Sequence, residues 1–139
     1  METNLCVAGF GGQGVMTLGK FLADATCNST DKNVTFFPSY GAEQRGGTLF
    51  INSSIVSDDI GRDDVKLVKA PVTELALEMG NAKVLNVIML GVYVGYTEVI
   101  DPAIVWQTIE HKLSSKPKLL PLNKQAFEKG LELGRAQKQ

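Results

Sequence analysis

The clearest pattern of apolar and polar positions lies near the start of the chain. Residues 5–8 form a short continuous apolar run, which is typical of a strand buried on both faces of a parallel sheet. A glycine-rich turn follows at residues 9–14. Apolar residues then recur at steps of three and four, the spacing of one face of an amphipathic helix: Val15, Leu18, Leu22 and Ala25. This segment predicts a strand, a glycine turn and a helix.

The next apolar segments predict further strands. Residues 34–37 are β-branched and aromatic and stop at Pro38, so they read as the second strand of a βαβ unit. Residues 39–48 have no hydrophobic period, and we expect them to form a loop beyond the carboxyl end of that strand. Strands are also predicted at residues 49–52, 54–56 and 65–68, and the alternation of the last one places it nearer the sheet edge.

The carboxyl-terminal half has the patterns of helices. Thr73 is a candidate N-cap of a helix that Gly80 closes. Asn81 opens the most apolar segment, residues 84–96, whose near-continuous hydrophobicity predicts a helix buried on more than one face.

Two more helices follow. Asp101 and Pro102 have the cap-then-proline pattern of a helix start. The last helix is predicted at residues 122–136, with three residues facing inward: Phe127, Leu131 and Gly134. The order of elements predicts an α/β fold in one domain over residues 1–139, with a Rossmann-like, mostly parallel sheet flanked by helices.

Charge and cysteine content exclude several classes of function. The 14 basic and 15 acidic residues leave a net charge of −1, which does not suit a nucleic-acid partner. The two cysteines, Cys6 and Cys27, cannot supply the four thiolates of an iron–sulfur cluster. No secretory signal precedes them, and the longest apolar run is too short for a membrane span. We therefore expect a cytoplasmic protein without membrane or nucleic-acid partners.

The glycine turn fits the pattern GxGxxG between a strand and a helix. Its backbone N–H groups could approach a phosphate or another anion, or the turn could need glycine only for its backbone angles. Asp31 precedes the second strand and so lies at the wrong end to hold a ribose, which argues against NAD. No Gly-Lys-Ser/Thr sequence follows the glycines, so ATP hydrolysis is not expected.

The loop at residues 39–48 carries the other candidate chemistry. Arg45 lies among glycines and could bind a phosphate or carboxylate through two hydrogen bonds. Alternatively, Glu43 and Arg45 form an ion pair that fastens the loop or a subunit contact. His111 is the single histidine and is expected on a helix surface. No nucleophilic catalytic set can be assembled around it.

Several motifs together resemble the gamma subunit of 2-oxoacid:ferredoxin oxidoreductases. These are GFGGQG, SYGAEQRGGT, INSS, KAPVTELA and GNAKVLN. The resemblance implies a complex that decarboxylates a 2-oxoacid, releases an acyl-CoA and reduces ferredoxin. It implies that thiamine diphosphate, iron–sulfur clusters, coenzyme A and magnesium serve the complex, with none bound by this chain alone. It implies no catalytic residue and no metal ligand here, and it suggests these cofactor-binding residues: Gly9, Gly11, Gly12, Gln13, Gly14, Tyr40, Glu43 and Arg45.

The resemblance also implies partners. They are the alpha, beta and delta-type chains of the oxidoreductase, with ferredoxin meeting the complex, and 2-oxoglutarate is the first expected substrate. A free-standing nucleotide-binding or regulatory module, and a purely structural subunit with an empty loop, remain alternatives.

One departure from the family pattern falls between Thr48 and Leu49. Family members carry several dozen more residues there, enough for about two strands and a helix. Either this chain is shortened or the recorded sequence omits a stretch, and we favour an omission because loss of sheet interior should be severely destabilising.

Overall fold

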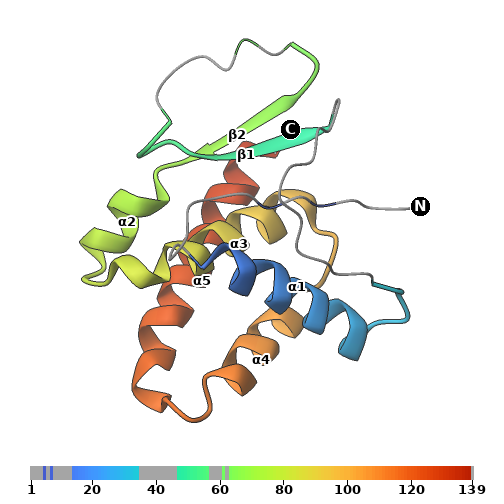
Figure 1. Cartoon of the computed structure of the whole chain (residues 1–139), viewed down its shortest axis with the longest axis vertical. Helices are drawn as coiled ribbons and strands as arrows, with labels where there is room; N and C mark the ends of the chain where they lie inside the picture. Colours follow the sequence, from blue (N-terminus) through green and yellow to red (C-terminus); the bar gives the residue numbers. More distant parts are fainter. Residues whose placement is uncertain are drawn as a thin grey trace.

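The computed structural model describes residues 5, 7, 14–34, 47–56, 61 and 63–138. A small parallel sheet lies at one end of the molecule, and a group of packed helices lies below it (Figure 1). The α/β class predicted from the sequence is confirmed. The elements, in chain order, are α1 (Val15–Ser29), β1 (Thr48–Asn52), β2 (Lys66–Ala70), α2 (Val72–Glu78), the 3-10 turn η1 (Ala82–Val84), α3 (Leu85–Thr97), α4 (Pro102–Lys112), η2 (Pro117–Leu119) and α5 (Leu120–Gln137).

The two strands pair in parallel, with Thr48 opposite Lys66 and Asn52 opposite Ala70. The side chains of Val68 and Ala70 are buried on the inner face of the sheet. Those of Leu67 and Lys69, which alternate with them along the strand, are exposed. The predicted strand at 49–52 is confirmed. The alternating strand predicted at 65–68 is also confirmed, although it extends to Ala70.

The strand predicted at residues 54–56 is wrong. The backbone N–H groups of Ile55 and Val56 both donate to the Asn52 carbonyl, at 3.1 Å each, and so form a turn. The Asn52 side-chain oxygen also accepts from the Ser54 N–H at 3.2 Å. This local Asn turn overrides the β-propensity of Ile55 and Val56. The strands predicted at 5–8 and 34–37 lie mostly outside the described residues.

Helix α2 differs from its prediction at one end and agrees at the other. Thr73 is not the N-cap, because the helix begins at Val72 directly after Pro71. The Thr73 hydroxyl instead accepts from the Asn52 side-chain amide at 2.8 Å. At the far end Gly80 has φ +88°, and the N–H groups of Gly80 and Asn81 donate to Leu77 and Ala76. This is a Schellman motif, and it confirms Gly80 as the stop signal.

The remaining helix starts follow the sequence signals. The Asn81 side chain accepts from the Lys83 N–H at 3.0 Å and leads through η1 into α3. The Asp101 carboxylate accepts from the Ala103 N–H at 2.8 Å, and Pro102 occupies the first turn of α4. The predicted helices at 84–96 and 122–136 are confirmed as α3 and α5.

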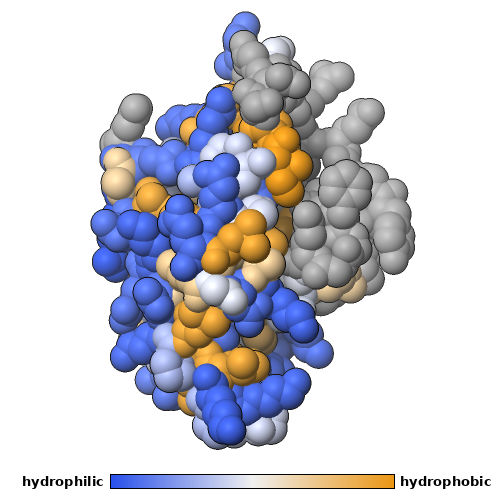
Figure 2. Space-filling model, turned by 90° about the vertical axis from the view of Figure 1, so that its left-hand side faces the viewer, coloured by the Kyte–Doolittle hydropathy of each residue, from blue (hydrophilic) through white to orange (hydrophobic). Residues whose placement is uncertain are grey.

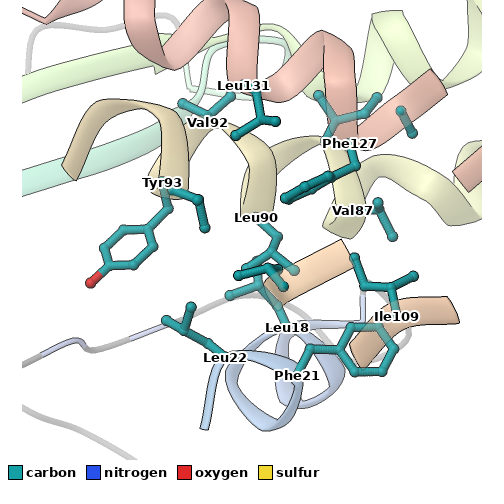
Figure 3. Close-up of a cluster of buried hydrophobic side chains, with 14 of the residues drawn as sticks. Leu18, Phe21, Leu22, Val87, Leu90, Val92, Tyr93, Ile109, Phe127 and Leu131 are labelled. Carbon is teal, nitrogen blue, oxygen red and sulfur yellow. The ribbon is translucent and has the colours of Figure 1, made fainter. Parts of the chain in front are cut away.

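Helix α3 is the centre of the core. Consecutive residues from Leu90 to Gly95 are all buried, so the helix is covered on more than one face, as its sequence predicts. Side chains of α1, α4 and α5 converge on it (Figure 3). Phe127, Leu131 and Gly134 of α5 face inward, which confirms their predicted orientation.

Glycines let α3 and α5 approach each other closely. Gly91 on α3 meets Gly130 on α5, while Gly95 approaches the Leu131 backbone and Gly134 the Val92 backbone. The spacing of four residues keeps the two glycines of each helix on one face. A Cβ atom added at Gly130 would lie 2.1 Å from the Ile88 carbonyl oxygen. The two helix backbones are therefore in direct contact.

The surface mixes apolar and polar side chains. On the side of the molecule where α2 lies, hydrophobic residues are interspersed with hydrophilic ones (Figure 2). Leu77 on α2 and Met16 on α1 are the most exposed large apolar residues in the described part of the chain, at 60% and 58%. Within that part, no helix has the length and apolarity to span a membrane.

Candidate functional site

The candidate site begins at the amino end of α1. Gly14 is the N-cap of this helix and has left-handed backbone angles, φ 74° and ψ 19°. Its carbonyl accepts the first helical hydrogen bond, from the Leu18 N–H at 2.9 Å. A glycine has no side chain with which to cap the next N–H groups. The helix dipole and these N–H groups therefore favour an anion at this end.

Asn86, on the first turn of α3, packs against Gly14. A Cβ atom at Gly14 would lie 2.6 Å from the Asn86 amide nitrogen and 2.9 Å from its Cγ. The Asn86 side-chain oxygen accepts from the Val87 N–H at 2.9 Å. Position 14 thus requires glycine for two reasons: its φ is positive, and the Asn86 amide leaves no room for a Cβ atom.

A second polar group lies where β1 ends and α2 begins. Besides the bond from Asn52 to Thr73, the Ser54 hydroxyl accepts from the Glu74 N–H at 3.1 Å. Ser54 thus satisfies a donor in the first turn of α2, a helix of seven residues. A side chain of this chain therefore serves the first turn of α2, whereas the N-cap residue of α1, Gly14, has no side chain that could do the same.

Most of the predicted site residues lie outside the described residues. Gly14 is described and stands at the amino end of α1, as the glycine motif predicts. The others lie outside the described residues and stay predictions: Gly9, Gly11, Gly12, Gln13, Tyr40, Glu43 and Arg45.

Sequence reasoning assigned no role to Asn86 or Asn52. A signal for Asn86 exists, because it is a polar residue inside the most apolar segment of the chain. Asn52 lies in the INSS motif, whose side-chain bonds to the next helix could not be read from residue order.

Charged and titratable groups in the described part are mainly structural. Lys112 and Asp24 form an ion pair of 2.8 Å that joins α4 to α1, and His111 is exposed on α4 as predicted. Burial raises the pKa of Tyr93, and a hydrogen bond with Thr97 offsets part of this rise. Within the described residues, no three His, Cys, Asp or Glu side chains form a group able to hold a metal ion.

A comparison with known protein families shows to which family this chain belongs. The family of pyruvate ferredoxin/flavodoxin oxidoreductases matches residues 4–61 and 46–133, two overlapping stretches that together span most of the sequence. The chain belongs to this family.

Curated relatives include two ketoisovalerate oxidoreductase subunits VorA. The subunit of Methanothermobacter thermautotrophicus is 28% identical over 177 residues and that of Methanothermobacter marburgensis 26% over 178 residues, each alignment covering 96% of this chain. The chain spans about 37% of the length of these relatives. The 2-oxoglutarate synthase subunit KorC of Archaeoglobus fulgidus is 48% identical over 58 residues, which is 42% of this chain and 30% of KorC.

Solved structures share the fold. The gamma subunit of keto/oxoacid ferredoxin oxidoreductase from Geobacter sulfurreducens superposes with a TM-score of 0.78 at 22% identity, over 92% of this chain and 95% of that one. A 2-oxoglutarate:ferredoxin oxidoreductase from Magnetococcus marinus, solved with 2-oxoglutarate, coenzyme A and succinyl-CoA bound, gives 0.74 at 18% identity, over 91% of this chain and 30% of that one. The family resemblance is confirmed, while the relatives leave the 2-oxoacid undetermined.

Proposed function

We propose that this chain is the gamma-type subunit of a cytoplasmic 2-oxoacid:ferredoxin oxidoreductase. The complex oxidatively decarboxylates a 2-oxoacid to an acyl-CoA and reduces ferredoxin, and alpha, beta and delta-type chains are the partners. The observation that carries the proposal is the family match across both halves of the chain. The fold shared with a gamma subunit supports it.

The proposed division of labour follows from the residues that this chain has. An iron–sulfur cluster takes four thiolates, whereas the sequence holds two cysteines, so the cluster ligands come from partner chains. Thiamine diphosphate and magnesium are likewise assigned to the partners, and this chain supplies neither a catalytic residue nor a metal ligand.

Coenzyme A is the cofactor for which this chain offers a suitable surface. Its phosphates are anions, and the amino end of α1 provides a helix dipole behind a glycine N-cap. The close contact of Gly14 with Asn86 fixes the amino end of α1 against α3. We assign Arg45 and the remaining glycine-loop residues to the same ligand, as donors to its phosphates.

Arg45→Ala tests this assignment in the assembled enzyme. We expect a higher KM for coenzyme A with the KM for the 2-oxoacid unchanged, because only one substrate loses a charged donor. Lys124→Ala is the control, since it removes an exposed cation from α5. An unchanged KM for coenzyme A would leave Arg45 a structural role.

The proposed substrate is 2-oxoglutarate, on the strength of the 48% identity with KorC over 58 residues. A branched-chain 2-oxoacid is the second candidate, because the VorA relatives align with 96% of the chain.

A pull-down of the native chain tests the function as a whole. We expect it to bring partner chains that reduce viologen when given coenzyme A and one of 2-oxoglutarate, 3-methyl-2-oxobutanoate or pyruvate. A chain that purifies alone and binds ADP or NADH in calorimetric titration would instead identify a free-standing nucleotide-binding module.

A further inference from the structure

Positive charge gathers on the turn that joins α4 to α5, which we call the basic turn (residues 112–118). Lys112, Lys116 and Lys118 are all exposed there, and residues 111–127 contain no acidic residue. These lysines are three of the 14 basic residues, so the other 11 stand against 15 acidic residues and the rest of the chain has a net charge of −4. The basic turn therefore has the opposite charge to the rest of the chain.

One of the three lysines has a structural role. Lys112 lies in the last turn of α4, where a cation suits the negative end of the helix dipole. It also forms an ion pair of 2.8 Å with Asp24 on α1. The ion pairs among the described residues include neither Lys116 nor Lys118, and both side chains are exposed.

The other two lysines lie where the following helix disfavours them. The amino end of a helix is the positive end of its dipole, so acidic side chains stabilise it and basic ones do not. Lys116 and Lys118 come immediately before α5, and the first turn of that helix holds no acidic residue. Residues that break a local rule of this kind are typical of functional surfaces.

The backbone of the basic turn is held by hydrogen bonds. The Lys116 N–H donates to the Leu113 carbonyl at 2.8 Å, and the Leu119 N–H donates to the Lys116 carbonyl at 3.0 Å. The buried Asn123 amide donates to the Leu119 carbonyl at 2.7 Å. The turn lies at the end of the molecule opposite to the sheet (Figure 1). A surface that is ordered beforehand loses less conformational entropy when it binds a partner.

The limited extent of the basic turn favours a protein partner over a nucleic acid. Glu110 and Glu128 flank it along the chain, and both are exposed. A nucleic-acid strand is a continuous row of phosphates, so it would meet these carboxylates and the net negative charge of the rest of the chain. A protein can instead present a small group of carboxylates. The lysine ammonium groups and the exposed Ser114 and Ser115 hydroxyls are suitable donors to carboxylate oxygens.

We propose that the basic turn is a docking surface for a carboxylate-rich patch on one of the partner chains of the oxidoreductase. This inference rests on the proposed function, since the partner chains are those of that complex. Exposed charges at the rim of an interface act mainly on the rate of association, because they attract the partner before contact. The expected signature is an association rate that depends on the basic turn and on salt.

The double substitution Lys116→Gln and Lys118→Gln in the full chain tests the proposal. Biolayer interferometry against the partner chains, purified without this chain, should show association about fivefold slower at low salt, with dissociation unchanged. The difference from the native chain should shrink at about 0.5 M salt, because salt screens exposed charges. Lys20→Gln with Lys83→Gln is the matched control, since it removes two exposed lysines outside the basic turn.

The outcomes separate this inference from the proposed function. A native chain that binds no partner chain would contradict the proposed function itself. If the native chain binds, but both double variants associate at its rate or are slowed equally, the docking surface is refuted and the proposed function stands. A single-stranded oligonucleotide that binds the native chain as tightly as the partner chains do would also refute it. Urea unfolding should show that Lys116→Gln with Lys118→Gln loses no stability, because both lysines lie near the positive end of the α5 dipole.

Discussion

The helix pair α3 and α5 and the sheet pair β1 and β2 are held together in different ways. At their glycines the helices meet through backbone, because no side chain separates them there. The sheet is completed by side chains: Asn52 and Ser54 connect it to α2, and Gln137 connects it to α5. The helical part therefore depends on shape, whereas the sheet depends on polar contacts that single substitutions can remove one at a time.

The largest effect is expected from Gly130→Ala. Its new Cβ would lie 2.1 Å from the Ile88 carbonyl oxygen and 2.8 Å from the Gly91 Cα, so the helices must separate. We expect a loss of about 3 kcal/mol in the free energy of unfolding, measured by urea titration. Gly80→Ala is the matched control, because that glycine has positive φ but no atom within 4 Å of its Cβ. It should cost about 1 kcal/mol, from backbone strain alone. Equal losses would mean that the helix contact adds nothing.

Gly14→Ala should have the next largest effect. The substitution strains a residue at φ +74° and forces the Asn86 amide away. We expect a loss of about 2 kcal/mol in unfolding free energy. Asn86→Ala in the same chain removes the two closest atoms, Nδ2 and Cγ, and leaves a Cβ contact of 3.2 Å. It should therefore recover part of the loss, which a double-mutant cycle measures. Strict additivity would show that Gly14 and Asn86 do not touch.

Removal of a side-chain contact in the sheet should cost less. Asn52→Ala deletes the hydrogen bonds to Thr73 and Ser54, at 2.8 Å and 3.2 Å. We expect a loss of about 1–2 kcal/mol by thermal and urea unfolding. Thr73→Val removes only the acceptor of the first bond and should cost less than Asn52→Ala. A larger loss from Thr73→Val would contradict the assignment of Asn52 as the connecting residue.

The smallest effect is a dependence on alkaline pH. Burial raises the pKa of Tyr93 above its ordinary value of 10.0, so the folded state favours the neutral phenol. This contribution to stability is fully present below pH 10.0 and is lost as the pH rises through the higher folded pKa. Urea titrations at rising pH should show the decline, and Tyr93→Phe should show less of it. A decline of equal size in Tyr93→Phe would assign it to other groups.

Sequence reasoning succeeded where a local signal decides the structure. Asp101 followed by proline fixed the start of α4, and Gly80 fixed the end of α2, because capping needs only neighbouring residues. It failed where a distant contact decides. Thr73 bonds to Asn52 and does not cap its own helix. No residue near Gly91 and Gly95 in the sequence indicates that their backbone contacts α5.

The candidate site was predictable to a similar degree. The GxGxxG pattern indicated a glycine at the amino end of a helix, and Gly14 lies there. The partner of that glycine, Asn86, comes from α3 and is far away in the sequence. A fold-dependent neighbour of this kind cannot be derived from spacing along one segment.

Whether the protein has further residues between Thr48 and Leu49 can be measured directly. Both residues lie within β1, so the joint forms continuous strand. The alignments with the VorA relatives extend over 177 and 178 residues, more than the 139 of this chain. The mass of the intact protein distinguishes a shortened chain, at 15.0 kDa, from a longer chain with an omitted stretch.

Reconstitution of the oxidoreductase with and without this chain tests the central claim most directly. Partner chains alone should fail to reduce viologen in the presence of a 2-oxoacid and coenzyme A, and addition of this chain should restore the reaction. Full coenzyme A-dependent activity without the chain would contradict its role as the gamma-type subunit.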